Sequence, residues 1–267
     1  MHTVFAATGL LAVLSAGGAH AAIIITSMLG NAQGSMTQTM SLDGNNLKMD
    51  RPSGAMLYRG DEDKVFEIDN EHHAYTEMSP EAMAKIKAKM DAAVAQMQQQ
   101  MAAMPEAQRK QMEAMMAARG MPGPSDSPTV PPVMSYQKNG AMRKVGKWDC
   151  QPYTLLSDGK PKADLCIAKL SDLGLTRDDL KPFIGFSVHM GKQMTAMDQR
   201  VSPMTAMNFD ALNKAIGFDG YPVETVYKLP MGPSITTTVQ SVEHRDAPAG
   251  SFDVPAGYTK RDMDAPR

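Results

Sequence analysis

Short runs in which apolar and polar residues alternate dominate the first third of the chain, and this period of two constrains the fold more than any other feature. Met40 and Leu42 alternate with threonine and serine, and Leu47 and Met49 resume the pattern after a turn. Successive side chains of a strand point to opposite faces of a sheet. Short alternating runs joined by turns therefore predict an antiparallel meander over residues 22–78.

At Ser79 the period changes to that of a helix. Ser79 is suited to cap a helix that a proline begins, and methionines recur every seven residues along the stretch that follows. The spacing predicts an amphipathic helix over residues 80–104. After Pro105 we expect a second helix to Arg119 and then a Pro-rich linker, so that residues 79–132 form a Met-rich helical insertion.

Strand patterns return in the second half of the chain. They cover residues 133–168 and a final hairpin, whereas residues 209–216 are typical of one short helix. Residues 170–194 are predicted to be helical in parts, with interruptions at Pro182 and Gly185. Strands at both ends and helices in the middle predict an α+β fold, in which helices pack against one face of one antiparallel sheet.

The two cysteines are placed to face each other across a hairpin. Cys150 and Cys166 flank Asp158-Gly159, which is a turn signal. With a three-residue loop at 157–159 the two cysteines would be directly opposed, about 4.5 Å apart at Cα, near the lower limit for a disulfide. A disulfide is expected in an oxidising compartment. The alternative is a metal or redox pair, but the chain has no CxxC motif.

The amino terminus has the form of a secretory signal peptide. Residues 3–19 are apolar or small, and Ala19-His20-Ala21 is a small-x-small cleavage pattern. We expect cleavage after Ala21 and a periplasmic location. The apolar run is shorter than the roughly 20 residues of a membrane span, and no later run is long enough, so no integral span is expected after cleavage.

The charge balance and the motifs also bear on function. Lysine and arginine total 27 against 29 acidic residues, so the net charge is −2. Nucleic acid is therefore not expected as a partner, because its binding needs clustered cationic charge. Residues 185–189 nearly match a nucleophile elbow, but His189 replaces the last glycine. We expect neither an enzyme nor a cofactor.

Several short motifs resemble those of a known group of bacterial envelope proteins. The motifs are Gly146-Lys-Trp148-Asp-Cys150, the second cysteine Cys166, Gly220-Tyr-Pro222-Val223 and the closing Phe252-x-x-Pro255-x-Gly257-Tyr258. With the leader, the meander and the Met-rich insertion, they resemble domain-of-unknown-function family 4412 over most of residues 23–260. That family is similar to the LolA/LolB lipoprotein carriers.

The resemblance implies a fold and a function. The fold is an open, unclosed antiparallel barrel under a helical lid, with an apolar concave face that holds acyl chains, and no catalytic residues are carried over. The expected segments are a signal peptide at 1–21, the meander at 22–78, the helical insertion and linker at 79–132, the C-terminal part of the same sheet at 133–260 and a tail at 261–267.

We therefore expect a non-catalytic binding protein for a lipid or another apolar molecule. The alternating apolar side chains of the meander are the candidate lining: Met36, Met40, Leu42, Leu47 and Met49. Met97 and Met101 of the first helix are added to it, since that helix is expected to act as a lid. Each buried methylene of an acyl chain would contribute about 0.8 kcal/mol.

Two other functions stay open. Thioethers are soft ligands that select Cu(I), although a methionine stripe at helical spacing also serves as packing surface. The methionines with suitable spacing are Met101 with Met104, Met112 with Met115 and Met116, and His189-Met190 with Met194 and Met197. In the third reading the chain is a structural module, and helix 80–119 docks on a protein partner.

Overall fold

The computed structural model describes residues 21–118, 133–196, 209–229 and 232–263. The predicted leader up to residue 20, the Pro-rich segment and Met197 lie outside these ranges. The strands are β1 (Ala21–Asn31), β2 (Gly34–Asp43), β3 (Asn46–Arg51), β4 (Gly54–Arg59), β5 (Lys64–Asp69), β6 (Ala74–Met78), β7 (Met134–Lys138), β8 (Arg143–Val145), β9 (Trp148–Ser157), β10 (Lys160–Lys169), β11 (Gly220–Tyr227), β12 (Ile235–Asp246) and β13 (Thr259–Arg261). The helices are α1 (Pro80–Ala102), α2 (Glu106–Ala118), α3 (Lys181–Ala196) and α4 (Phe209–Ile216), with short 3-10 turns η1 (Leu170–Leu173) and η2 (Asp178–Leu180).

All described strands belong to one sheet. Its order is β13-β6-β5-β4-β3-β2-β1-β12-β11-β10-β9-β7, and β8 pairs with β9 beside this path. Every pairing is antiparallel except that of β13 with β6. Because β1 pairs with β12, these two strands join the N-terminal strands on one side of the sheet to β11, β10, β9 and β7 on the other, and β13 returns to the outer edge beside β6. The strands β3–β6 together with β13 are called the N-terminal wing below.

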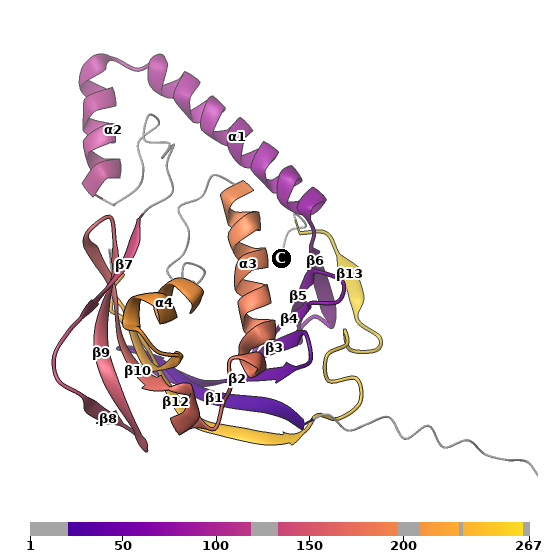
Figure 1. The fold of residues 1–267 in the computed structure, drawn as a ribbon. Helices are drawn as coiled ribbons and strands as arrows, with labels where there is room; N and C mark the ends of the chain where they lie inside the picture. Colours follow the sequence, from indigo (N-terminus) through magenta and orange to yellow (C-terminus); the bar gives the residue numbers. More distant parts are fainter. Residues whose placement is uncertain (1–20, 119–132, 197–208, 230–231, 264–267) are drawn as a thin grey trace, which may run out of the picture.

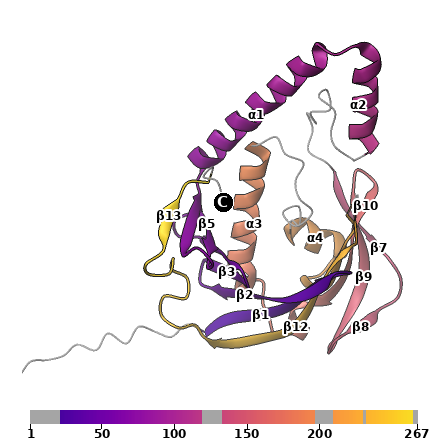
Figure 2. The ribbon, with the colours of Figure 1, turned by 180° about the vertical axis from the view of Figure 1, so that it is seen from behind.

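The sheet is strongly bent, and the helices lie inside the bend. Figures 1 and 2 show α3 and α4 on the concave side, with α1 and α2 arching over them from β6 toward β7. The predicted antiparallel sheet with helices on one face is confirmed. The sheet is not closed, because its order ends at β13 and β7, so the structure shows a large open sheet and does not confirm a barrel.

The helix predictions are confirmed in part. α1 begins after Ser79, whose hydroxyl accepts a hydrogen bond from the amide of Ala82 at 3.2 Å, and α4 occupies the predicted residues. The predicted interruption of α3 is wrong, since Pro182 lies in its first turn, where no intrahelical partner for the amide is needed. None of the described helices is long and apolar enough to cross a membrane.

The two faces of the N-terminal wing are covered differently. On the concave face, Leu47, Tyr58 and Val65 belong to one large core with Phe186 and Met190 of α3. On the convex face, a smaller core is covered by the segment after β12. It contains Ala55, Leu57, Phe66 and Ile68 of the sheet, with Tyr75, Phe252, Val254 and Tyr258 packed against them. Apolar burial on both faces fixes the wing in place.

The disulfide between Cys150 and Cys166 is confirmed, with the two Cα atoms 5.3 Å apart. The predicted register is wrong. The hairpin loop has two residues, Asp158 and Gly159, with φ values of 50° and 73°, as a type I′ turn requires. A register shift follows in β10, so that Cys166 lies opposite Pro152.

Removal of this disulfide should lower stability without changing the fold. The two cysteines are 16 residues apart in sequence, and a loop of that size is worth about 3 kcal/mol. We expect reduction with dithiothreitol to lower the unfolding free energy in urea by roughly this amount. The double variant C150A/C166A should be weakened similarly and be insensitive to the reductant. Equal stability of reduced and oxidised protein would contradict the prediction.

Candidate functional site

Four of the predicted lining residues lie together on the concave face. Met40 pairs with Met49 and Leu42 with Leu47 across β2 and β3. All four are at most 6% exposed, and they belong to the core that includes residues of α3. The alternation that suggested an apolar lining therefore marks a face that is covered by a helix of the same chain.

The structure does not bring the other three predicted residues to this cluster. Met36 lies near the tip of the β1–β2 hairpin and is 46% exposed. Met97 is half-buried and Met101 is buried, but both belong to α1, which arches above α3 (Figure 1), and neither is part of the core that holds Met40 and Met49.

A row of methionines leads outward from the core along the concave face. Met40 pairs with Met49, and Met49 pairs with Met56 on β4. The same row then becomes polar, since it continues through Glu67 of β5, Thr76 of β6 and Arg261 of β13. Met56 is half-buried, whereas Met49 is 6% exposed. The concave face thus changes from apolar to charged across the N-terminal wing.

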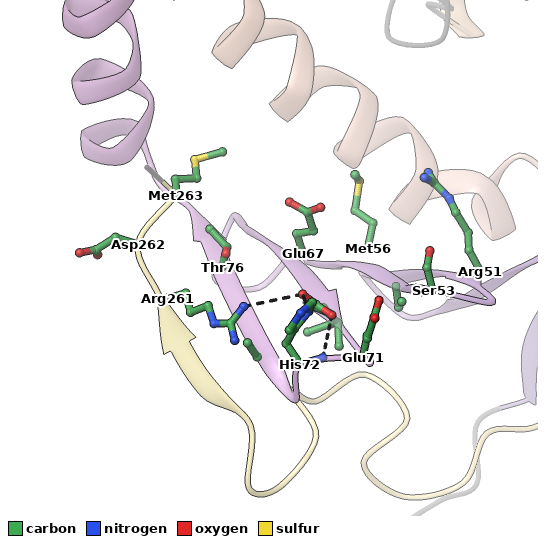
Figure 3. A pocket seen from close by; sticks show the side chains of 15 residues that line it. Arg51, Ser53, Met56, Glu67, Glu71, His72, Thr76, Arg261, Asp262 and Met263 are labelled. Atoms are coloured by element: carbon green, nitrogen blue, oxygen red, sulfur yellow. Dashed lines mark hydrogen bonds and ion pairs between the residues drawn. The ribbon is translucent and has the colours of Figure 1, made fainter. Parts of the chain in front are cut away.

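A cavity of about 400 Å³ lies over this polar end of the row. Figure 3 shows Met56, Glu67 and Thr76 rising from the strands toward the helices, with Arg51 at one side of the cavity and Arg261 at the other. The full lining is Arg51, Ser53, Gly54, Ala55, Met56, Glu67, Ile68, Asp69, Glu71, His72, Ala74, Thr76, Arg261, Asp262 and Met263.

Hydrogen bonds organise the charges at the floor of this cavity. Both carboxylate oxygens of Asp69 bind His72, which donates its amide at 3.0 Å and lies with Nδ1 at 2.8 Å. Arg261 lies 3.9 Å from the same carboxylate. The amide of His72 is the main cause of the lowered pKa of Asp69. Asp69 is therefore ionised and already partnered at neutral pH.

Gly54 allows β4 and β5 to approach closely beneath the cavity. A Cβ at this position would overlap the carbonyl oxygen of Ile68. Only glycine fits there, so the floor is set by backbone as well as by side chains.

A second cavity of about 320 Å³ adjoins the first at the amino end of α1. Its walls include Ser79, Glu81 and Lys85, and it shares Arg261–Met263 with the first cavity. Lys260 binds Glu77 at 2.5 Å beside it. Arg261–Met263 therefore lie between two polar cavities on the N-terminal wing.

A buried histidine fastens α3 to the N-terminal wing. His189 is 5% exposed, and its Nδ1 lies 2.8 Å from the carboxylate of Asp63 in the β4–β5 turn. A carboxylate only accepts, so Nδ1 donates, and in neutral His189 the other ring nitrogen is an acceptor. That atom, Nε2, is buried and has no partner among the described residues.

The same contact includes Tyr58 and Gly185. The rings of Tyr58 and His189 are 5.8 Å apart, and a Cβ on Gly185 would lie 3.1 Å from the Tyr58 hydroxyl. The pKa of Asp63 is lowered chiefly by the hydrogen bond from His189. The helix is thus held by close packing and by one charge-assisted hydrogen bond.

The other candidate chemistry is dispersed. Gly185–His189 lie within α3, and the Ser187 hydroxyl donates to the carbonyl of Phe183 at 2.9 Å, so these residues do not form an elbow. Of the second-helix methionines, Met115 is 47% exposed, and the side chains of Met112, Met116 and Met194 lie outside the described set. Within the described residues, no group of three or more His, Cys, Asp or Glu is placed to hold a metal ion.

Sequence reasoning missed the cavity. Its charged residues come from residues 51–72 and from Arg261 and Asp262, almost two hundred residues later. One signal was present, because Glu67 is a charged residue at a position whose neighbours on the same face, Val65 and Met56, are apolar.

The comparisons with known proteins identify a family. A family model described as "Domain of unknown function (DUF4412)" matches residues 74–258. No curated protein matches the chain. A solved structure described as "Structure of PNGF-II in C2 space group" is similar at a TM-score of 0.35 and 9% identity, over 91% of this chain and 31% of that one. The chain spans about a third of that protein's length, and so low a score carries no argument.

The Asp63 contact yields a prediction about stability and pH. Asp63→Asn keeps a side chain that tolerates the left-handed backbone at this position (φ 50°) but removes the charge. We expect a loss of about 1 kcal/mol in unfolding free energy at pH 7. Because the pKa of Asp63 is lowered in the folded state, this contribution is present above the unfolded pKa of about 3.9 and is lost as pH falls through the lowered value.

The measurement is urea unfolding of both proteins at pH 7 and near pH 2. Asp61→Asn is the matched control, since Asp61 is 57% exposed and 3.9 Å from its nearest cation, Arg59. It should change stability by less than about 0.5 kcal/mol. A difference between wild type and Asp63→Asn that persisted undiminished at low pH would refute the role of the charge.

Proposed function

We propose that this chain, which belongs to the DUF4412 family, is an exported, non-catalytic protein that binds an amphipathic, lipid-like molecule on the concave face of its sheet. The observation that carries the proposal is the methionine row Met40-Met49-Met56, which leaves the buried core and ends at a cavity with a charged rim.

The size and chemistry of the cavity support this function. About 400 Å³ lies within the usual range of small-molecule sites. Methionine side chains are flexible and polarizable, and they adapt to apolar partners of varied shape. A chain of methylenes in contact with Met56 would gain about 0.8 kcal/mol for each group removed from water. The charged residues beyond Met56 would keep the polar end of the same molecule at the rim.

The arrangement of the helices also supports a carrier. Phe186 and Met190 of α3 cover the inner part of the concave face, and α1 and α2 arch above it (Figure 2). We propose that a bound tail extends from the cavity toward Met49 when α3 is displaced. An open antiparallel sheet with helices in its concavity agrees with the LolA-like layout, which remains part of this proposal.

Export is supported by two features of the chain. Residues 1–21 have the pattern of a cleavable leader. The Cys150–Cys166 disulfide is of the kind that persists in oxidising compartments such as the periplasm.

The two alternative functions that the sequence suggested, copper(I) binding and docking of a protein partner, remain predictions. Copper(I) binding would require several thioethers around one ion, and the methionines whose spacing suggested it, such as Met101 with Met104, remain its candidates. Docking of a protein partner on α1 would use side chains such as Val94, which is 43% exposed.

The proposal predicts that binding depends on Met56. Met56→Gln should weaken uptake of a fluorescent fatty acid by about tenfold, because an amide in place of the thioether puts a polar group against the ligand tail. Met142→Gln is the matched control and should bind as wild type does, since Met142 is 65% exposed in the β7–β8 connection, far along the sheet from β4. Thermal unfolding of each variant checks that the fold is intact.

The same protein should also carry lipid when it is purified gently from its host. Mass spectrometry of an organic extract is expected to show amphiphiles at a constant ratio to protein. The proposed carrier function would be refuted if preparations reproducibly contained no amphiphile and the wild-type protein also failed to take up the fluorescent probe. Binding that responded equally to Met56→Gln and Met142→Gln would show that the site lies elsewhere.

A further inference from the structure

We infer that the cavity on the N-terminal wing recognises a zwitterionic headgroup, a phosphate ester that carries an ammonium group, through Arg51, Ser53 and Glu71. This inference rests on the proposed function and specifies the class of amphiphile that the concave face would take.

The three residues line the cavity where two neighbouring chain reversals meet. Arg51 is the last residue of β3, Ser53 lies in the β3–β4 connection and Glu71 in the β5–β6 connection. The amide of Asn70 donates to the carbonyl of Ser53 at 3.3 Å, which fixes the turns side by side. Figure 3 shows Arg51 and Ser53 on the side of the cavity opposite Arg261, with Glu71 between Ser53 and His72.

A cation and an anion line this end of the cavity without neutralising each other. Within the described part of the chain, neither Arg51 nor Glu71 forms an ion pair, although pairs within 4.0 Å occur elsewhere on the wing, as between Lys48 and Asp50. Two unpaired opposite charges at one cavity are complementary to a ligand that carries both. The guanidinium and the Ser53 hydroxyl are donors for a phosphate, and the Glu71 carboxylate attracts an ammonium group.

The charge of the whole cavity argues against a simple anion. Glu67, Asp69, Glu71 and Asp262 line it together with only two arginines, Arg51 and Arg261. Arg261 belongs to β13, four strands along the sheet from β3, and its guanidinium lies 3.9 Å from the carboxylate of Asp69. A fatty acid would therefore be held mainly by its tail, whereas the acidic residues would also attract the ammonium group of a zwitterion.

The position of the apolar residues sets the direction of the ligand. Met56 lies two residues after Gly54, on the same face of β4, and Gly54 pairs with Arg51. A headgroup held by Arg51 and Glu71 would thus place its tail over Met56 and toward Met49. This is the order that an amphiphile needs, with the head at the rim and the chain toward the core.

The test is a headgroup series on one tail. Dodecylphosphocholine, dodecyltrimethylammonium and dodecyl phosphate are titrated into the full mature protein below their micelle concentrations, and heat is measured. We expect phosphocholine to bind about tenfold more tightly than either singly charged ligand, since one charge-assisted contact is worth about 1.4 kcal/mol or more.

Three variants assign the contacts. Arg51→Gln should weaken phosphocholine and phosphate about tenfold and leave trimethylammonium unchanged. Glu71→Gln should weaken phosphocholine and trimethylammonium instead. Lys48→Gln is the control, because Lys48 lies on the convex face, where Leu57 is its cross-strand partner, and should alter none of them.

The outcomes separate the two proposals. Equal affinity for all three headgroups, unchanged by Arg51→Gln and Glu71→Gln, would overturn the zwitterion site and leave the tail-binding function standing. Tighter binding of dodecyl phosphate than of phosphocholine would overturn it as well. If none of the dodecyl ligands bound, the carrier function itself would fail.

Discussion

The packing of α3 onto the concave face is the contact on which the rest of the structure depends. A bent sheet of this size exposes a large apolar inner surface, and Leu47, Tyr58 and Val65 would face water without a cover. Gly185 lets the helix approach Tyr58 closely, and Phe186 follows with its ring 5.9 Å from the tyrosine ring. A larger residue at position 185 would lift the helix from the wing and expose the core on both sides of it.

The N-terminal wing can support a ligand site because its convex face is also buried. Phe252, Val254 and Tyr258 pack against Leu57, Phe66 and their neighbours. The Tyr258 hydroxyl donates to Asn70 at 3.1 Å, and the amide of Thr259 donates to His73 at 3.0 Å. These bonds tie the chain end to the β5–β6 turn that carries Glu71. The β5–β6 turn, which carries Glu71 at the cavity, is thus fixed by contacts on the convex side of the sheet.

Local sequence patterns predicted the strands and helices well, but they did not predict contacts between residues that are far apart in the sequence. Alternation identified the strands of the meander, and Ser79 marked the start of α1, because each depends on neighbours in sequence. The disulfide was found from the Asp-Gly turn, but its register depended on a bulge with no sequence signal. The family assignment over residues 74–258 agrees with the short motifs that suggested it.

The site was predicted less well, for a physical reason. Met40, Leu42, Leu47 and Met49 were correctly placed on one face, but alternation does not distinguish a face covered by a helix from one open to a ligand. His189 and Asp63 are 126 residues apart in sequence, and Arg51 and Arg261 are still farther apart. Pairings of this kind are set by strand order, which periodicity does not contain.

The boundary between the core and the cavity is one strand wide. Met49 is 6% exposed, whereas Met56, its partner on β4, lines the cavity. The helix that covers Met49 is anchored by apolar packing and by a hydrogen bond to Asp63, whose side chain is 65% exposed. Displacement of α3 would expose Met49 and would break the hydrogen bond between His189 and Asp63. A ligand tail that reached Met49 would therefore have to take the place of α3 on the concave face. It could do this only if it buried as much apolar area as the helix buries there.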